Sequence, residues 1–214
     1  MTAPRDLSGP GDAGDRGDLG DRGDLGGLAR LLAALSPSCG PVRLVAVDGH
    51  AGSGKTTFAA RLSAALSGAP VLHLDDLASH GALFDWTERL AAQVTEPLSR
   101  GTTARFGIYD WQHRSFTRTG ELPPARAVLV EGVGAGRRAL RPLLAALLWM
   151  DVPAAAAHAR GMRRDGPEQA DFWDGWRRAE ARHFAADPSL PHADFLVRER
   201  GRGHEVLPGP RGKR

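Results

Sequence analysis

The chain has 214 residues, of which 25% are charged and 42% hydrophobic, so we expect one domain with a buried core and not a disordered or fibrous chain. Its single cysteine, Cys39, excludes an internal disulfide and a multi-cysteine zinc site. Neither an apolar run of roughly 20 residues nor a secretory signal pattern is visible, so we expect a cytoplasmic protein with no membrane partner.

The net charge of +3 is concentrated near the C-terminus. Residues 1–27 carry a net charge of −3 and residues 198–214 a net charge of +4, which leaves +2 for the residues between them. We expect residues 201–214 to form a basic, flexible tail. Glycine and proline interrupt its arginines, and it has no aromatic residue on which a base could stack. The sequence therefore does not favour nucleic-acid binding.

The N-terminal segment is rich in glycine and aspartate and reads GDRGDL twice over residues 14–25. It offers almost no apolar surface to bury, so we expect disorder up to about Gly27. The two Arg-Gly-Asp tripeptides within it match adhesion motifs, an interpretation that a cytoplasmic location does not favour. Residues 28–35 then have the pattern of a short helix.

From residue 42 onwards, apolar runs alternate with segments of helical periodicity. Strands are expected at residues 42–47, 71–74, 127–130, 147–152 and 195–197. Helices are expected at residues 58–66, 84–98, 137–146, 154–164 and 171–185. This alternation predicts a single α/β domain over residues 28–200, with a parallel sheet of about five strands and helices on both faces.

One motif decides the class of site. Residues 49–56 match the P-loop pattern G-x-x-x-x-G-K-[ST] between an expected strand and an expected helix. Glycines allow backbone N–H groups to point at phosphate oxygens, and the following helix adds its positive N-terminal end. Lys55 would reach the β- and γ-phosphates of ATP, and Thr56 would hold Mg²⁺. The expected phosphate-binding residues are Gly49, His50, Ala51, Gly52, Ser53, Gly54, Lys55, Thr56 and Thr57.

Acidic residues follow two of the expected strands. Because parallel strands present their C-terminal ends to the ligand, we expect these carboxylates to face the P-loop. Asp75 could accept the proton of an attacking hydroxyl group, and Asp76 could contact the substrate or cap a helix. Glu131 has the position of a ligand to Mg²⁺ or to its water.

Three arginines, Arg160, Arg163 and Arg164, lie at the end of an expected helix. On a mobile segment, such guanidinium groups can neutralise the charge that develops on a transferred phosphoryl group. A solvated basic last turn, favoured by the helix dipole, is an equally good interpretation.

In this order, the motifs resemble the uridine kinase-like branch of the P-loop kinases over about residues 42–197. The resemblance implies a P-loop NTPase fold with a small lid. It also implies that Asp75 acts as the base, that Glu131 helps to hold Mg²⁺, and that the lid arginines bind near ATP, Arg160 among them. A closer resemblance is to small uridine kinase-like ATP-binding proteins of actinobacteria. Their shared motifs correspond here to Tyr109-Asp110-Trp111, Glu131 to Arg138, Trp173 with Trp176, and Ala193-Asp194.

The acceptor site is less clearly marked. Uridine kinases have an aromatic Asp-Ser-Phe-Tyr segment at the base, whereas residues 75–80 here read Asp-Asp-Leu-Ala-Ser-His. A hairpin that packs on the core explains the aromatic residues near position 110 as well as a stacking site does. His113 is expected to be exposed, whereas Trp173 and Trp176, with Glu180 on the same helical face, are expected to pack in the core. The candidate acceptor-site residues are Asp76, Arg105, Tyr109, Asp110 and Trp111.

The leading interpretation is a kinase that transfers the γ-phosphoryl group of Mg²⁺·ATP to a hydroxyl group of a small acceptor, with a nucleoside as the favoured class. Asp75 would be the base, and Lys55, Arg163 and Arg164 would stabilise negative charge. The alternative is a P-loop protein that hydrolyses ATP slowly as a switch, without a small acceptor. A base aimed at an acceptor hydroxyl group distinguishes the two, because a switch does not need one.

Overall fold

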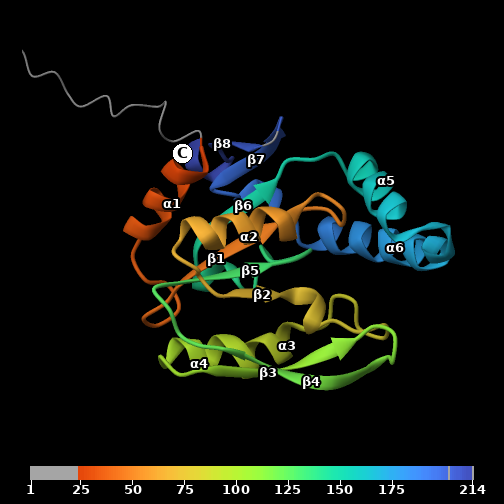
Figure 1. Ribbon diagram of the computed structural model, residues 1–214, viewed down its shortest axis with the longest axis horizontal. Helices are drawn as coiled ribbons and strands as arrows, with labels where there is room; N and C mark the ends of the chain where they lie inside the picture. The colour runs from red at the N-terminus through yellow and green to blue at the C-terminus, as the bar shows by residue number, and fades with distance from the viewer. Residues whose placement is uncertain (1–23, 202, 214) are drawn as a thin grey trace, which may run out of the picture.

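The computed structural model describes residues 24–201 and 203–213, so the expectations for residues 1–23 lie outside the described part of the chain. A six-stranded sheet with the order β2-β5-β1-β6-β7-β8 forms its centre (Figure 1). The first five strands in this order pair in parallel, which confirms the predicted parallel sheet, and β8 joins the edge antiparallel to β7. The strands of this sheet are β1 (Arg43–Asp48), β2 (Val71–His73), β5 (Ala127–Glu131), β6 (Leu144–Met150), β7 (Phe195–Arg200) and β8 (Gly203–Pro208).

Helices cover both faces of the sheet, as the sequence predicts. The side chains of β1 alternate between the faces: Leu44 packs in the cluster on one face and Val45 in the cluster on the other. The Val45 face is covered by α1 (Leu25–Ala34) and α2 (Lys55–Ala65). The Leu44 face is covered by a helical segment made of α3 (Thr87–Leu90), a π-helical turn (Ala91–Thr95) and α4 (Glu96–Ser99).

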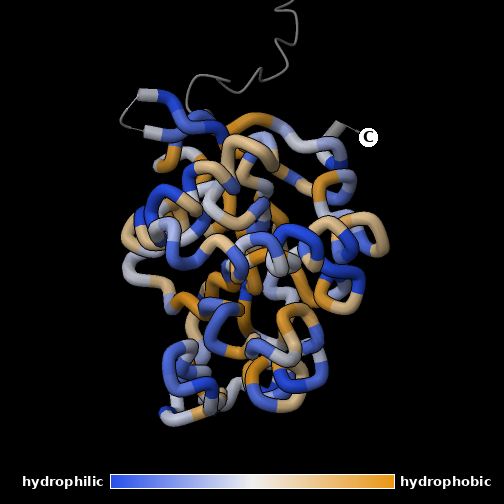
Figure 2. The backbone as a smooth tube through the Cα atoms, turned by 90° about the vertical axis from the view of Figure 1, so that its right-hand side faces the viewer, coloured by the Kyte–Doolittle hydropathy of each residue, from blue (hydrophilic) through white to orange (hydrophobic). Residues whose placement is uncertain are grey.

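Coverage on both faces explains why the central strands read as continuous apolar runs. All five residues of β5 are buried, and so are the last five of β6. The hydrophobic segments lie inside the molecule and the hydrophilic ones around them (Figure 2). No helix in the described ranges, 24–201 and 203–213, is long and apolar enough to cross a membrane.

Two further units flank the sheet. An antiparallel hairpin of β3 (Ala104–Asp110) and β4 (Ser115–Leu122) lies beside the α3–α4 segment (Figure 1). The helices α5 (Ala154–Asp165) and α6 (Ala170–Ala186) project together on the right-hand side of the view, and we call them the lid-like unit (Figure 1). Short 3₁₀ helices occur at Leu74–Asp76, Arg141–Leu143, Pro167–Gln169, Leu190–His192 and Arg211–Lys213.

The sequence prediction of a helix at residues 137–146 is wrong. These residues form turns and a 3₁₀ helix, and β6 already begins at Leu144. Pro142 lies in the middle of the segment, where an α-helix would lose a hydrogen bond. Pairing of β6 with both β1 and β7 then favours the extended conformation for the apolar run.

Both ends of the described chain are more ordered than the sequence indicated. Helix α1 begins at Leu25, inside the segment expected to be disordered, because the Asp24 carboxylate accepts a hydrogen bond from the backbone N–H of Gly27. Much of the expected flexible tail forms β8, which pairs with all of β7 and buries Val206. Burial of that side chain and a complete antiparallel ladder stabilise a segment that has little periodicity in sequence.

Candidate functional site

The P-loop connects β1 to α2, at the C-terminal edge of the sheet, as its motif predicts. Gly54 has a φ of 90° and precedes the first residue of α2, Lys55. Gly52 has a φ of 82°, and a Cβ atom there would lie 2.1 Å from the carbonyl oxygen of Ala157 in α5. Only glycine allows this close contact, so the P-loop packs directly against the lid-like unit.

Lys55 is buried at the centre of this loop, with 8% of its surface exposed. Its Nζ donates hydrogen bonds to the carbonyl oxygens of Gly49, at 3.0 Å, and His50, at 2.9 Å. The ammonium group therefore lies against the loop in the position from which it could reach phosphate oxygens.

Asp48, the last residue of β1, holds the P-loop against the segment after β5. Its fully buried carboxylate accepts hydrogen bonds from the backbone N–H groups of Gly49, at 2.7 Å, Gly134, at 2.8 Å, and Gly136, at 2.8 Å. The sequence contains no signal for this role, because the partners of Asp48 on the second loop are 86 and 88 positions away.

A polar cluster joins the start of α2 to the ends of β2 and β5. The Thr56 hydroxyl group donates to Glu131 Oε1 at 3.0 Å, and His73 Nδ1 lies 2.5 Å from the same oxygen. The hydrogen bond to Glu131 raises the pKa of His73, although burial acts in the opposite direction. The structure thus brings together Thr56 and Glu131, the two residues expected to hold Mg²⁺, and adds His73, which the sequence analysis did not select.

Asp75 follows β2 in the 3₁₀ turn and lies beside this cluster. Its side chain is exposed to solvent within the cleft, whose walls are protein atoms. Partial loss of hydration inside the cleft raises the pKa of Asp75, and the nearby Glu131 carboxylate raises it further, whereas Lys55 lowers it. Trp111 fixes the turn, because its indole Nε1 donates to the Asp75 carbonyl oxygen at 3.2 Å.

One cleft of about 640 Å³ joins these groups to the lid-like unit. Its walls are the P-loop, the turn after β2, the tip of the hairpin, and the facing sides of α5 and α6. Trp173 and Trp176 are buried in a small cluster, as expected, and also form part of the wall. The charged and hydroxyl-bearing side chains that line the cleft include Lys55, Thr56, Asp75, Glu131, Arg160, Arg164, Asp165 and Glu199, and the aromatic ones are His80, Trp111, Phe172, Trp173 and Trp176.

The lid arginines are held by carboxylates. Arg160 pairs with Glu199 of β7 at 2.7 Å, and both side chains are nearly half exposed. Arg164 forms a bidentate pair with Asp165, at 2.6 and 2.9 Å, which raises the pKa of Arg164. Arg163, by contrast, is exposed and does not line the cleft.

Four of the candidate acceptor-site residues do not line the cleft, and only Trp111 does. Arg105 lies on the exposed side of β3 and pairs with Glu121 of β4. Tyr109 is buried, and its hydroxyl group lies 3.0 Å from His80 Nδ1. It therefore supports a lining residue from behind.

The other two candidate residues, Asp110 and Asp76, have no contact with the cleft. Asp110 accepts backbone hydrogen bonds from Gln112 and His113, which with the His113 ring lower its pKa to about 2. His113 is exposed, as expected. Asp76 is half-buried, and this burial raises its pKa.

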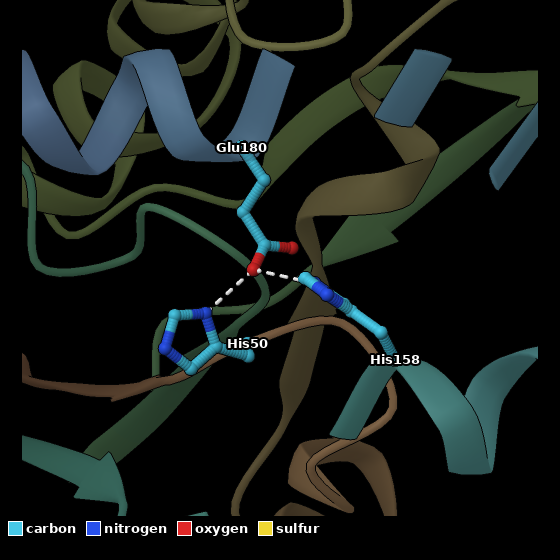
Figure 3. Close-up of side chains that lie close together, drawn as sticks. All are labelled: His50, His158 and Glu180. Carbon is cyan, nitrogen blue, oxygen red and sulfur yellow. Dashed lines mark hydrogen bonds and ion pairs between the residues drawn. The ribbon is translucent and has the colours of Figure 1, made fainter. Parts of the chain in front are cut away.

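His50 points away from the P-loop interior and toward Glu180 of α6 (Figure 3). The buried Glu180 carboxylate also accepts the backbone N–H of Ala51 at 3.1 Å and the indole N–H of Trp176 at 3.0 Å. The predicted helical face of Trp173, Trp176 and Glu180 is thus buried. The pairing with the P-loop, 130 residues distant, had no signal in the sequence.

A second cavity of about 800 Å³ adjoins the cleft, and His80 lines both. On its wall, the buried Arg137 donates from Nη1 to the Phe84 carbonyl oxygen, at 2.8 Å, and to the Thr87 hydroxyl group, and it stacks on the ring of Trp86. Burial lowers the pKa of Arg137 to about 10. This arginine therefore ties the loop after β5 to the start of α3.

Two solved structures share this fold. A protein from Bacillus stearothermophilus described as a possible uridine kinase has a TM-score of 0.58 at 20% identity, over 80% of this chain and 96% of that chain. A protein from Silicibacter sp. TM1040 described as a candidate fructose transport system kinase has a TM-score of 0.53 at 22% identity, over 79% of this chain and 91% of that one. The expected resemblance to uridine kinase-like P-loop kinases is thus confirmed at the level of the fold.

In sequence, a segment of 125 residues is 32% identical to a curated protein from Arabidopsis thaliana, inorganic pyrophosphatase TTM2. The match covers 54% of this chain but only 18% of that protein, so this chain spans a small part of its relative. No protein-family model matches the chain.

Proposed function

We propose that the protein is a phosphotransferase that moves the γ-phosphoryl group of ATP to a hydroxyl group of a small acceptor. The observation that carries the proposal is the position of Asp75, a carboxylate with a raised pKa that lines the same cleft as Lys55 and Thr56 of the P-loop. A nucleotide-binding loop alone serves many functions, but a base in the same cleft is what an acceptor hydroxyl group requires.

The residues of the cleft fit a Mg²⁺ ion. Two neighbouring ligands of an octahedral Mg²⁺ ion, each at about 2.1 Å, lie about 3.0 Å apart. Thr56 Oγ1 and Glu131 Oε1 are 3.0 Å apart, and both are oxygen ligands of the kind this ion prefers. When bound with ATP, Mg²⁺ would neutralise charge on the β- and γ-phosphates.

In the proposed reaction, the acceptor oxygen bonds to the γ-phosphorus while the bond to the β–γ bridging oxygen breaks, and ADP leaves. Asp75 takes the proton of the acceptor hydroxyl group, which its raised pKa favours because the base then lies closer to the operating pH. Lys55 moves from the P-loop carbonyl oxygens to the phosphates. Arg160 and Arg164 leave their carboxylate partners and stabilise the equatorial oxygens.

The acceptor that we propose is nucleoside-like, with a flat ring. Rings line the side of the cleft next to Asp75: His80 and Trp111 have centroids 5.0 Å apart, and Phe172 lies 5.9 Å from Trp111. Aromatic side chains bind flat rings by stacking or edge contacts, and they suit a linear, highly charged acceptor less well. The fold similarity to a possible uridine kinase supports the same class.

ADP release tests this proposal. The protein is incubated with Mg²⁺·ATP and a panel of uridine, cytidine, deoxynucleosides, nicotinamide riboside, pantothenate, glycerate and a blank without acceptor. Inorganic pyrophosphate is tested separately for hydrolysis, because of the sequence match to a pyrophosphatase. A rate that rises above the blank with one nucleoside supports the proposal. A rate equal to the blank for every acceptor, in protein that binds ATP, favours the ATP-hydrolysing switch instead.

Two substitutions assign the roles. Asp75→Asn should abolish transfer and leave the Kd for ATP within a few-fold, whereas Lys55→Ala should weaken both binding and turnover. Asp151→Asn is the matched control, since its carboxylate pairs with Arg198 outside the cleft. Unchanged turnover in Asp75→Asn would remove that residue from the role of base.

A further inference from the structure

A second cluster of chemically active side chains lies behind the P-loop, where three elements meet. His50 comes from the P-loop, His158 from α5 and Glu180 from α6, and Figure 3 shows all three pointing toward one another. His50 Nδ1 lies 2.6 Å and His158 Nε2 lies 3.0 Å from the same carboxylate oxygen, Glu180 Oε1. These three ligand atoms all lie within 4.8 Å of one another.

The two oxygens of Glu180 have different surroundings. Oε2 accepts hydrogen bonds from two N–H groups, the backbone N–H of Ala51 and the indole N–H of Trp176. Oε1 faces only the two imidazole rings in the described structure. Two imidazole nitrogens therefore converge on one oriented carboxylate oxygen.

We propose that His50, His158 and Glu180 form a binding site for a first-row transition metal ion of the Zn²⁺ class, distinct from the Mg²⁺ site of the catalytic cleft. Two imidazoles and one carboxylate are an established ligand set for zinc. In a tetrahedral site with bonds of about 2.1 Å, ligand atoms are about 3.4 Å apart. The two imidazole nitrogens lie 2.6 and 3.0 Å from Glu180 Oε1, so each would move away from that oxygen by less than about 1 Å to reach this separation. The N–H donors on Oε2 would hold the carboxylate in orientation.

Metal binding at this site requires no covalent or redox change in the protein. Each imidazole has two ring nitrogens, so the nitrogen that faces Glu180 can bind the ion while the other nitrogen carries the ring proton. The side chains of His50 and His158 are 22% and 12% exposed, so an ion and a water as fourth ligand can reach the site from the ring side. Glu180 is 2% exposed and forms the closed end.

A bound ion would connect the P-loop to both helices of the lid-like unit. The P-loop already touches α5 at Gly52, so the ion would strengthen an existing contact and would not impose a new arrangement. The expected result is a P-loop that is held more rigidly and a protein that unfolds at a higher temperature. An excess of metal a hundredfold over its Kd should raise Tm by about 5–10 °C.

The experiment uses the full chain, freed of metal by a chelator that is then removed. Zn²⁺ is titrated by calorimetry and Co²⁺ by its visible absorption, which is intense only in tetrahedral sites. Both titrations contain saturating Mg²⁺ and a non-hydrolysable ATP analogue, so that the catalytic cleft is occupied. The main variant is His158→Ala, because alanine keeps α5 intact, and Glu180→Gln is the second. His113→Ala is the matched control: its imidazole pairs with one carboxylate, Asp110 at 2.9 Å, without a second histidine.

The proposal expects one equivalent of Zn²⁺ and tetrahedral Co²⁺ absorption in the parent protein and in His113→Ala, and a loss of affinity of at least a hundredfold in His158→Ala. It is overturned if the parent protein binds no Zn²⁺ at micromolar concentrations, or if His158→Ala and Glu180→Gln, folded by circular dichroism, bind it as well as the parent. Since the readout is binding and not turnover, failure here leaves the proposed phosphotransfer untouched, and the reverse also holds.

Discussion

Asp48→Asn tests how strongly one buried carboxylate holds the two glycine-rich loops of the site together. In the folded protein, Oδ1 of Asp48 accepts the N–H groups of Gly49 and Gly134, and Oδ2 accepts the N–H of Gly136. Asparagine keeps one oxygen, which can serve the first two donors. Its amide nitrogen then faces the N–H of Gly136, a donor against a donor.

The loss can be worked from these contacts. A hydrogen bond to a charged group contributes about 1.5–3 kcal/mol, and a buried donor without a partner costs about 1–3 kcal/mol. These two effects describe the same N–H group and overlap, so we expect Asp48→Asn to lower the free energy of unfolding by about 2–4 kcal/mol. For a protein of this length, 1 kcal/mol corresponds to about 2–4 °C in Tm, which gives a decrease of about 4–16 °C.

Thermal unfolding followed by calorimetry at neutral pH measures this decrease. Asp151→Asn is the control, because it removes the same charge from an exposed pair with Arg198, whose contribution is about 0–1 kcal/mol. If the Asp48→Asn variant folds and its Tm lies within 2 °C of that of the parent protein, the carboxylate does not hold these loops together and the reasoning fails.

Three further predictions concern the cleft. Gly161→Ala should lower Tm by up to about 8 °C in a melting experiment, because its Cβ atom would lie 2.2 Å from the ring of Trp173. Such overpacking costs about 1–3 kcal/mol, and the higher helix propensity of alanine offsets about 1 kcal/mol of that cost. A higher Tm would contradict this prediction. Glu199→Gln should lower the Kd for ATP about fivefold in equilibrium titrations, because it frees Arg160 and removes one negative charge beside the P-loop. A fivefold change in Kd corresponds to about 1 kcal/mol of binding free energy. An unchanged or weaker affinity would refute the role of this pair. Asp75 acts as a base only when it is deprotonated, so kcat should fall as the pH drops through the raised pKa of this residue. The acid limb of the pH profile of kcat should therefore lie above about pH 4, the approximate pKa of an ordinary aspartate. A limb at or below about pH 4 would contradict the assignment.

Local signals were sufficient for the fold class and for the position of the P-loop in the fold. The P-loop is a pattern of eight consecutive residues that needs only a strand before it and a helix after it, and β1 and α2 supply both. The buried parallel strands read as apolar runs because both faces of the sheet are covered, and this is visible without tertiary information. The Asp75 and Glu131 positions followed from the same rule, since the ends of parallel strands meet at one edge.

Tertiary structure decided what depends on partners far away in the sequence. Residues 144–146, expected at the end of a helix, became the start of β6 because this strand pairs with β1 and β7, and a short apolar run has no period strong enough to show this. The tail became β8 because β7 offered an edge. Likewise, Asp48 holds Gly134, and Glu180 holds His50, through contacts 86 and 130 residues apart. A hydrogen bond requires two groups within about 3 Å, and the sequence does not encode that distance except through the fold.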